Sequence, residues 1–270
     1  MKLTVRKTRE LLWFLKYPRF YPELFRRLGK ARKLFTGADP CATQTQATGW
    51  CRSLAIGLPE AVQRITGRPL PAPVRERFPH EFAEAEERAR GCPVPMGGPG
   101  NLDLLYCMAD YLQAKKVVET GVAYGWSSLA ILLSLKHRKG AKLISTDLPY
   151  PHRNSQDYVG CVVPEALRRH WRLLRLADRE GLPIALGDLQ PLDLCHYDSD
   201  KSYEGRMWAY PRLWNALRPG GCLISDDVED NLGFHDFCEH LGIAPVIVEM
   251  PCKDGKQYAG ILFKNPGRQP

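Results

Sequence analysis

An alternation of short apolar strands with amphipathic helices runs through the chain from residue 102 onward, and it limits the possible folds more than any other feature. The predicted strands are 116–120, 142–147, 183–188, 193–198 and 222–227. The predicted helices are 102–112, 126–137, 164–180 and 203–217. Short apolar strands that alternate with helices are typical of a parallel sheet covered on both faces. The expected fold class is α/β with a doubly wound sheet.

The C-terminal end of the chain adds a topological constraint. Two further apolar runs, 244–250 and 258–264, are separated by only seven residues, PCKDGKQ. A parallel crossover needs about a dozen residues or more, whereas a hairpin needs few. We therefore expect a mostly parallel, seven-stranded sheet that ends in an antiparallel hairpin.

Upstream, the segment GCPVPMGGPG at 91–100 interrupts the pattern and marks a domain boundary. We expect a basic, aromatic arm at 1–35, a mainly helical extension at 36–96 and the main domain at 97–270. A length of 270 residues suits one large domain or two small ones.

Almost all of the net charge lies in the arm. Residues 1–35 contain 11 Lys and Arg against Glu10 and Glu23, a net of +9, which leaves 27 basic and 28 acidic residues elsewhere. Residues 36–270 therefore show no general nucleic-acid footprint. Basic and aromatic residues together suit peripheral contact with a membrane surface. The alternative is that the aromatic side chains pack on the domain or on a second subunit, which also leaves a homo-oligomer open. Pro18 and Pro22 prevent one continuous helix.

The cysteines and apolar runs bear on location. Nine scattered cysteines without a C-x-x-C motif make a disulfide framework or zinc site improbable and indicate a reducing cytoplasm. No apolar run reaches the length of about 18 residues that a transmembrane helix needs, and we see no signal-peptide pattern. The expected location is the cytoplasm, with the inner face of the membrane as a docking place.

The segment VVETGVAYGWSS at 117–128 places glycines where the first strand turns into a helix. Glycine lets backbone N–H groups approach a ligand closely, and a helix N-terminus favours an anionic group. The dinucleotide fingerprint G-x-G-x-x-G would need glycine at position 123 and a small residue at 126, but Ala123 and Trp126 stand there. Nicotinamide cofactors are therefore disfavoured.

The remaining pattern, E-x-G-x-x-x-G-x-S, resembles motif I of the class I S-adenosylmethionine-dependent methyltransferases, and the resemblance spans residues 97–264. It implies a Rossmann-like methyltransferase fold and S-adenosylmethionine as cofactor. By this resemblance Gly121 and Ser127 approach the methionyl part, Asp147 binds the ribose hydroxyls, and Asp188 lies beside the adenine. The alternative is that the acids only cap helices or turns. The expected cofactor-binding residues are Glu119, Gly121, Tyr124, Gly125, Ser127, Asp147 and Asp188.

Two acidic clusters, YDSDK at 197–201 and SDD at 225–227, follow neighbouring predicted strands. The carboxyl ends of parallel strands form the ligand crevice, so Asp198, Asp226 and Asp227 should lie close together. Three carboxylates at such a distance repel one another unless a cation or protons intervene. Oxygen ligands select Mg²⁺ or a similar ion.

The segment DSDKSYEGRMWAYPRLWNALRPGGCLISDDV resembles two metal-dependent O-methyltransferase groups: the macrocin type, which methylates sugar hydroxyls, and the catechol and caffeoyl-coenzyme A type. Both imply that Asp198, Asp226 and Asp227 are the metal ligands. Asp227 replaces the asparagine of the catechol group, which favours a sugar acceptor. Asp200 holds the sugar group's base position and Lys201 that of the catechol group. A one-residue shift of the Tyr-Glu pair that follows leaves this choice open.

Together these patterns predict a Mg²⁺- and S-adenosylmethionine-dependent O-methyltransferase. Its expected acceptor is a hydroxyl group of a sugar, a glycan or a glycosylated natural product. One alternative is methylation of a catechol or other phenol, and another is a non-catalytic binding protein that keeps the fold. His196, inside a predicted strand, is expected to be a packed core residue rather than a catalyst.

Overall fold

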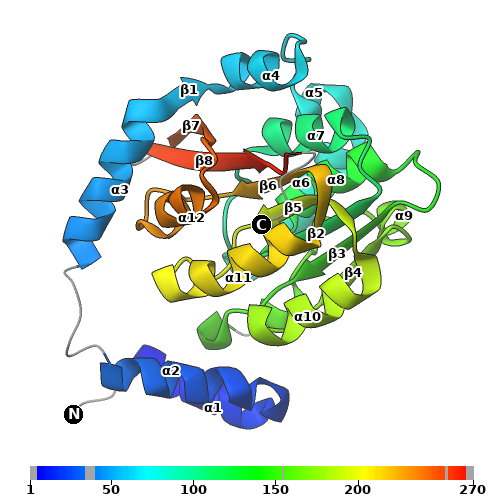
Figure 1. Ribbon diagram of the computed structural model, residues 1–270. Coiled ribbons are helices and arrows are strands. Elements are labelled where there is room, and N and C mark those ends of the chain that lie inside the picture. The colour runs from blue at the N-terminus through cyan, green and yellow to red at the C-terminus, as the bar shows by residue number, and fades with distance from the viewer. Residues whose placement is uncertain (1–4, 34–39, 154, 253–254, 266–270) are drawn as a thin grey trace.

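The computed structural model describes residues 5–33, 40–153, 155–252 and 255–265. An eight-stranded sheet crosses the molecule in the order β1-β7-β8-β6-β5-β2-β3-β4 (Figure 1). Its strands are β1 (Ala55–Gly57), β2 (Lys116–Thr120), β3 (Lys142–Thr146), β4 (Trp171–Leu174), β5 (Leu192–Tyr197), β6 (Leu217–Ser225), β7 (Val246–Cys252) and β8 (Gly255–Phe263).

Strand β8 pairs antiparallel with both β6 and β7, and every other pair in the sheet is parallel. The prediction of a doubly wound, mostly parallel sheet that ends in an antiparallel hairpin is therefore confirmed. The prediction of seven strands was one short. The eighth, β1, belongs to the N-terminal extension and pairs with β7, so the extension contributes to the same sheet as the main domain.

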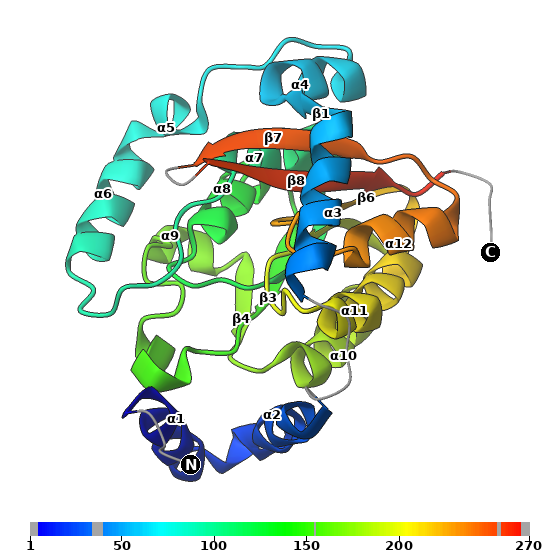
Figure 2. The ribbon, with the colours of Figure 1, turned by 90° about the vertical axis from the view of Figure 1, so that its left-hand side faces the viewer.

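Helices cover both faces of the sheet, because successive strand residues point to opposite sides. Val117 and Leu143 belong to the core beneath α4 to α8, whereas Val118 and Ile144 belong to the core beneath α3, α10, α11 and α12 (Figure 2). The helices are α1 (Val5–Lys16), α2 (Tyr21–Lys33), α3 (Pro40–Leu54), α4 (Leu58–Thr66), α5 (Val74–Arg77), α6 (Pro79–Arg90), α7 (Leu102–Tyr111), α8 (Trp126–Leu135), α9 (Glu165–Arg168), α10 (Asp178–Leu189), α11 (Tyr203–Ala216) and α12 (Gly233–Leu241). Three short 3₁₀ turns complete the described elements: η1 (Pro18–Phe20), η2 (Pro151–Arg153) and η3 (Ser155–Asp157).

The region 164–188 differs from its prediction. The expected helix 164–180 contains the short α9, strand β4 and the start of α10, and the expected strand 183–188 lies inside α10. Leu182, Ala185, Leu186 and Leu189 are buried at helical spacing along α10. A short apolar run does not distinguish a strand from a buried helix, and here the periodicity of 3.6 residues decides.

The N-terminal arm folds against the domain as α1, η1 and α2. In Figures 1 and 2 both helices lie at one end of the molecule, below α10. Trp13, Phe14 and Phe20 are buried together and pack against Leu148, which follows β3. These three aromatic side chains therefore pack against the domain, which was the alternative to membrane contact. None of the described helices is long and apolar enough to cross a membrane.

Candidate active site

The carboxyl ends of the central strands meet at one edge of the sheet. Thr120 of β2 pairs with Tyr197 of β5 and with Thr146 of β3, and Tyr197 pairs with Ser225 of β6. The residues that follow these strand ends surround a cavity of about 1220 Å³. The cavity lies at the point where the order of the strands reverses, which is the usual ligand site of open α/β sheets.

The glycine loop after β2 forms one wall of this cavity. Gly121 has φ +78°, and a Cβ atom there would overlap the backbone carbonyl of Asp198. Gly125 has φ +95° at the N-cap of α8, and its Cβ would lie 3.0 Å from the Cα of Gly160. Gly121 lines the cavity, whereas Gly125 allows another segment to pack behind the loop. Both glycines therefore serve close backbone approach.

Asp147, directly after β3, holds the same loop. Its Oδ1 accepts hydrogen bonds from the backbone N–H groups of Val122 (2.8 Å) and Ala123 (3.2 Å). Burial raises the pKa of Asp147 to about 6, although these two hydrogen bonds act in the opposite direction. Because Asp147 also lines the cavity, it both shapes the loop and faces the space that a ligand would occupy.

The other predicted cofactor residues divide into two groups. Ser127 lines the cavity at the start of α8. Tyr124 instead donates from its hydroxyl to the carbonyl of Val94, at 3.1 Å. Glu119 is fully buried within β2 and accepts hydrogen bonds from Ser128 (2.5 Å) and Ser145 (2.7 Å). Neither Tyr124 nor Glu119 is part of the described cavity lining.

Asp188 does not occupy the predicted position at a strand end. It lies near the end of α10, is exposed and forms an ion pair with Arg172 of β4. The misassigned strand caused this error. The segment that follows β4 lines the cavity instead and includes Ala177 and Asp178.

Asp178 is a cavity residue that the sequence analysis missed. It accepts a hydrogen bond from Ser199 Oγ at 2.5 Å, and burial raises its pKa to about 6. This contact joins the start of α10 to the loop after β5. The position of Asp178 shortly after a strand could have identified it, but only if the segment WRLL had been assigned as that strand.

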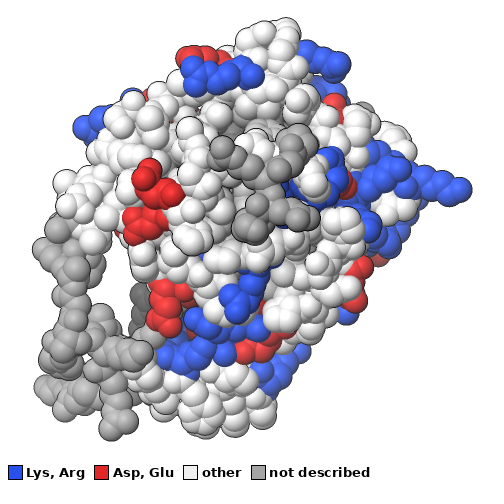
Figure 3. Space-filling view, in the orientation of Figure 1, with Lys and Arg blue, Asp and Glu red and all other residues white. Residues whose placement is uncertain are grey.

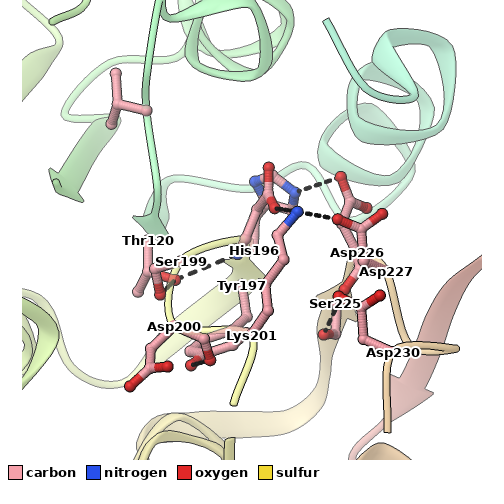
Figure 4. Close-up of polar contacts among 12 residues, drawn as sticks. Thr120, His196, Tyr197, Ser199, Asp200, Lys201, Ser225, Asp226, Asp227 and Asp230 are labelled. Carbon is pink, nitrogen blue, oxygen red and sulfur yellow. Dashed lines mark hydrogen bonds and ion pairs between the residues drawn. The ribbon is translucent and has the colours of Figure 1, made fainter. Parts of the chain in front are cut away.

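At the ends of β5 and β6, two of the predicted metal ligands face one ammonium group. Lys201 Nζ lies 3.3 Å from Asp198 Oδ1 and also contacts Asp227 (Figure 4). Burial and the charge of Asp226 raise the pKa of Asp198 to about 6, although Lys201 acts in the opposite direction. The structure thus brings the predicted acidic residues together and places a cation between two of them.

His196 faces Asp226 from the interior of the domain. The imidazole lies between two acids, with Nε2 3.5 Å from Asp226 Oδ2 and Nδ1 3.4 Å from Glu119 Oε1. Burial alone would lower the pKa of His196, but the two adjacent acids outweigh it and raise the pKa to about 10. His196 is buried as expected, and it also connects β2 to the acidic end of β6.

Arg206 of α11, which the sequence analysis did not single out, supports the loop after β6. Its side chain is fully buried, and Nη2 donates to the carbonyl of Asp227 at 2.6 Å. Asp227 has φ +52°, an uncommon backbone conformation for a residue with a side chain. The sequence pattern could have identified Arg206, because it lies on the same buried face of α11 as Tyr210 and Leu213.

The two candidate bases have different surroundings. Asp200 lines the cavity, but its Oδ1 accepts a hydrogen bond from the backbone N–H of Ser202, the N-cap of α11, at 3.1 Å. Lys201 also lines the cavity and reaches the carboxylates directly. The structure therefore ties Asp200 to the start of a helix and directs Lys201 toward the acidic cluster.

The donor set fits a divalent cation in its chemistry. Asp198 Oδ1 is buried and makes no hydrogen bond within the described chain, and the ammonium group of Lys201 stands in as a cation beside it. Carboxylate oxygens are the ligands that Mg²⁺ prefers. In the present side-chain positions, however, no group of three or more His, Cys, Asp or Glu among the described residues is arranged to hold a metal ion. Lys201 would have to move away for Asp198, Asp226 and Asp227 to bind one.

Comparison with known proteins places this geometry in context. Residues 118–228 match the family model described as a methyltransferase domain. No curated protein matches the sequence. The match spans β2 to the start of the loop after β6, so it contains both the glycine loop and the acidic cluster.

Solved structures share the fold at low sequence identity. Cofactor-bound Rv0187 from MTB is 16% identical with a TM-score of 0.56, over 69% of this chain and 90% of that chain. The O-methyltransferase TomG from Streptomyces achromogenes, in complex with SAM, is 16% identical with a TM-score of 0.53 over the same shares. The O-methyltransferase from Bacillus cereus, in complex with SAH, is 15% identical with a TM-score of 0.53, over 79% of this chain and all of that chain. The family model assigns a methyltransferase domain to residues 118–228 and the solved structures share its fold, in agreement with the predicted Rossmann-like methyltransferase fold.

Proposed function

We propose, from the methyltransferase domain at residues 118–228, that this protein transfers a methyl group from S-adenosylmethionine to a hydroxyl group with the help of Mg²⁺. One observation carries the proposal. A single cavity joins the glycine loop at Gly121 to the acidic cluster at Asp198, and the backbones of these two residues are in contact. Cofactor and acceptor bound at these two ends would be neighbours.

The β2–β3 end of the cavity suits S-adenosylmethionine. Gly121, Ser127 and Asp147 all line it, and the first turn of α8 offers backbone N–H groups to a carboxylate. Asp147 Oδ1 is engaged by the loop, which makes Oδ2 the oxygen that we assign to a ribose hydroxyl. Two structural neighbours, TomG and the Bacillus cereus enzyme, are O-methyltransferases in complex with SAM or SAH.

The β5–β6 end suits the acceptor. Asp198, Asp226 and Asp227 would hold the cation, which when bound lowers the pKa of a coordinated hydroxyl group. His196 keeps Asp226 in place from within the core, and Arg206 fixes the backbone of Asp227. Both residues thus support the acidic cluster from the interior, His196 beside the Asp226 carboxylate and Arg206 through the backbone.

Lys201 is the residue that we assign as the general base. The acceptor oxygen attacks the sulfonium methyl group, the carbon–sulfur bond breaks, and the hydroxyl proton must leave. An ammonium group held by Asp198 and Asp227 cannot accept a proton, so Lys201 would first release its own proton to water, and the neutral amine would then take the hydroxyl proton of the acceptor. Asp200 is already engaged at the start of α11, so we place it in a supporting role.

Two classes of hydroxyl compound are candidates for the acceptor. A sugar, a glycan or a glycosylated natural product is our first candidate, because the cavity of about 1220 Å³ exceeds what a small phenol needs beside the cofactor. The contact of Lys201 with the acids favours a catechol or other phenol as the second candidate, since lysine is the base of the group that it resembles.

A panel experiment tests the proposal. The protein is incubated with S-adenosylmethionine and Mg²⁺ together with glycosides in one set and catechols in another, and mass spectrometry detects the gain of one methyl group. Methylation of a glycoside supports the first candidate and methylation of a catechol the second. If neither set is methylated although the cofactor binds, the O-methyltransferase proposal fails.

The rival of another class is a binding protein that retains the methyltransferase fold without catalysis. A scaffold has no need for three acidic residues gathered at the ends of β5 and β6, which is why we favour the enzyme. We place it in the cytoplasm, since the described cysteines carry free thiols.

A further inference from the structure

We propose that α1 and α2 form a docking surface for an anionic lipid bilayer and that this surface borders the mouth of the active-site cavity. The inner side of the arm is fixed to the domain. Trp13 Nε1 donates to Gln156 Oε1 at 3.0 Å, and Arg26 forms two hydrogen bonds of 2.7 Å with Glu180 of α10. The outer side is therefore held in one orientation.

That outer side exposes an unusual amount of apolar surface. Leu11 (40% exposed), Leu12 (60%) and Leu15 (56%) lie on one side of α1, and Phe25 (65%) and Leu28 (55%) follow on α2. Five of the nine large, exposed apolar residues of the described chain thus fall on these two helices. Figure 3 shows the lower edge of the molecule, over α1 and α2, as mostly uncharged, with basic and acidic side chains above it. Contiguous exposed apolar residues mark interaction sites.

The charge of the arm identifies the partner. Among residues 8–29 every exposed charged side chain is basic, namely Arg9, Lys16, Arg19 and Arg27. Both acids of the arm, Glu10 and Glu23, are only partly exposed and line the active-site cavity. Leucines beside cations, without exposed acids, complement the acyl chains and headgroups of anionic lipids.

A second cavity also supports an anionic lipid as the partner. A groove of about 670 Å³ lies between α1 and residues 93–95. Its charged lining consists of Arg9, Lys16 and Arg153, and all its other lining residues are apolar. Such a groove suits one anionic headgroup with the upper part of its acyl chain.

The arm also forms part of the active site. Glu10, Glu23, Arg26 and Arg27 line the same cavity as Gly121 and Asp198, so docking would place the cavity mouth beside the bilayer. An acceptor hydroxyl carried on a lipid could then enter between arm and domain. This consequence rests on the proposed function, whereas the docking surface does not.

Flotation with vesicles tests the docking surface on the full chain. Vesicles of phosphatidylcholine alone are compared with vesicles that also contain phosphatidylglycerol. We expect the wild type to float with the anionic vesicles only, and added salt should reduce its recovery. L12S/L15S should lower the apparent partition coefficient about tenfold or more, and R9Q/K16Q should lower it by a similar factor. The matched control I184S removes an exposed apolar side chain from α10 and should float like the wild type.

Three outcomes would overturn the docking surface. These are wild-type protein that floats with neither vesicle, wild-type protein that floats with both equally, and L12S/L15S that floats as well as the wild type. Circular dichroism melting checks that each variant is folded. The assay needs neither cofactor nor acceptor, so a protein that binds S-adenosylmethionine but does not float contradicts the docking surface and leaves the proposed function standing.

Discussion

At the β2–β3 end of the cavity the backbone determines the shape of the site, whereas at the β5–β6 end charged side chains determine it. The first end consists of a glycine loop whose amides are held by Asp147. The second consists of three carboxylates, of which Asp198 and Asp227 face Lys201 and Asp226 faces His196, on a backbone that Arg206 supports. The backbone groups of the first end are already arranged to bind a ligand. At the second end, the ammonium group of Lys201 lies where we expect a metal ion.

This difference predicts how the two ends respond to change. A backbone site fails when a side chain intrudes or an anchoring hydrogen bond is lost, and the damage falls on cofactor affinity. A charge-balanced site fails when one charge is removed, and the damage falls on the transfer step. The predictions below aim to separate these two outcomes.

The largest effect is expected at the acidic cluster. Asp227→Ala and Asp226→Asn should each lower the rate of methyl transfer at least about a hundredfold, because metal coordination contributes several kcal/mol to such a reaction. Affinity for S-adenosylmethionine should stay within about twofold. Asp188→Ala is the matched control and should alter neither quantity, since Asp188 is an exposed partner of Arg172. Rate assays and isothermal titration measure both, and an active Asp227→Ala enzyme would contradict the assignment.

Removal of divalent cations should have a comparable effect on the same end. Treatment with EDTA is expected to stop turnover, and added Mg²⁺ should restore it. Full activity after exhaustive metal removal would show that Lys201 and His196 alone balance the acids during catalysis.

Gly121→Ala should disrupt the backbone site. The new Cβ overlaps the carbonyl of Asp198 at a positive φ, so we expect a loss of about 2–4 kcal/mol in the free energy of unfolding, together with loss of cofactor binding. Gly140→Ala is the matched control, because Gly140 has a nearly identical φ of +77° with no atom within 4 Å. It should cost only about 1–2 kcal/mol for the backbone conformation. Equal losses in denaturant unfolding would show that the contact with Asp198 is unimportant.

Asp147→Ala should weaken binding of S-adenosylmethionine at least about tenfold, through loss of a charge-assisted hydrogen bond and of the loop anchor. Asp147→Asn keeps one oxygen for the amides of Val122 and Ala123 and should weaken binding less. Titration calorimetry measures both constants. An unchanged dissociation constant in Asp147→Ala would exclude the ribose role.

A smaller effect is expected from pH. Burial raises the pKa of Asp147 to about 6, so its carboxylate is charged above that pH and becomes protonated below it. Protonation removes an acceptor, so affinity for the cofactor should fall a few-fold between pH 7.5 and 5.5. Asp147→Asn should not show this dependence, and a wild type with constant affinity would contradict the charged role.

The parts of the fold that follow local periodicity could be predicted from the sequence. The strand before the glycine loop was located residue for residue, and the acids after β5 and β6 converge because parallel strands end together. The hairpin followed from a connection too short for a crossover. These inferences depend on chain geometry alone.

The predictions that were wrong concern segments whose structure is determined by tertiary packing rather than by the local sequence. The run PIALGD is apolar enough for a strand, but burial of Leu182 and Leu186 against the sheet makes it a helix. Asp188 was misplaced as a result, and Asp178 was overlooked. The roles of His196 and Arg206 depend on which buried charges they meet across the sheet, and no local pattern contains that information.

Binding of S-adenosylmethionine to the full-length protein, measured by calorimetry in EDTA and again in Mg²⁺, tests the account most directly. The two-ended site predicts binding at one molecule per chain in both buffers, with dissociation constants that agree within about twofold. Absence of binding in both buffers, or binding only with Mg²⁺, would contradict a cofactor end formed by the backbone independently of the acidic cluster.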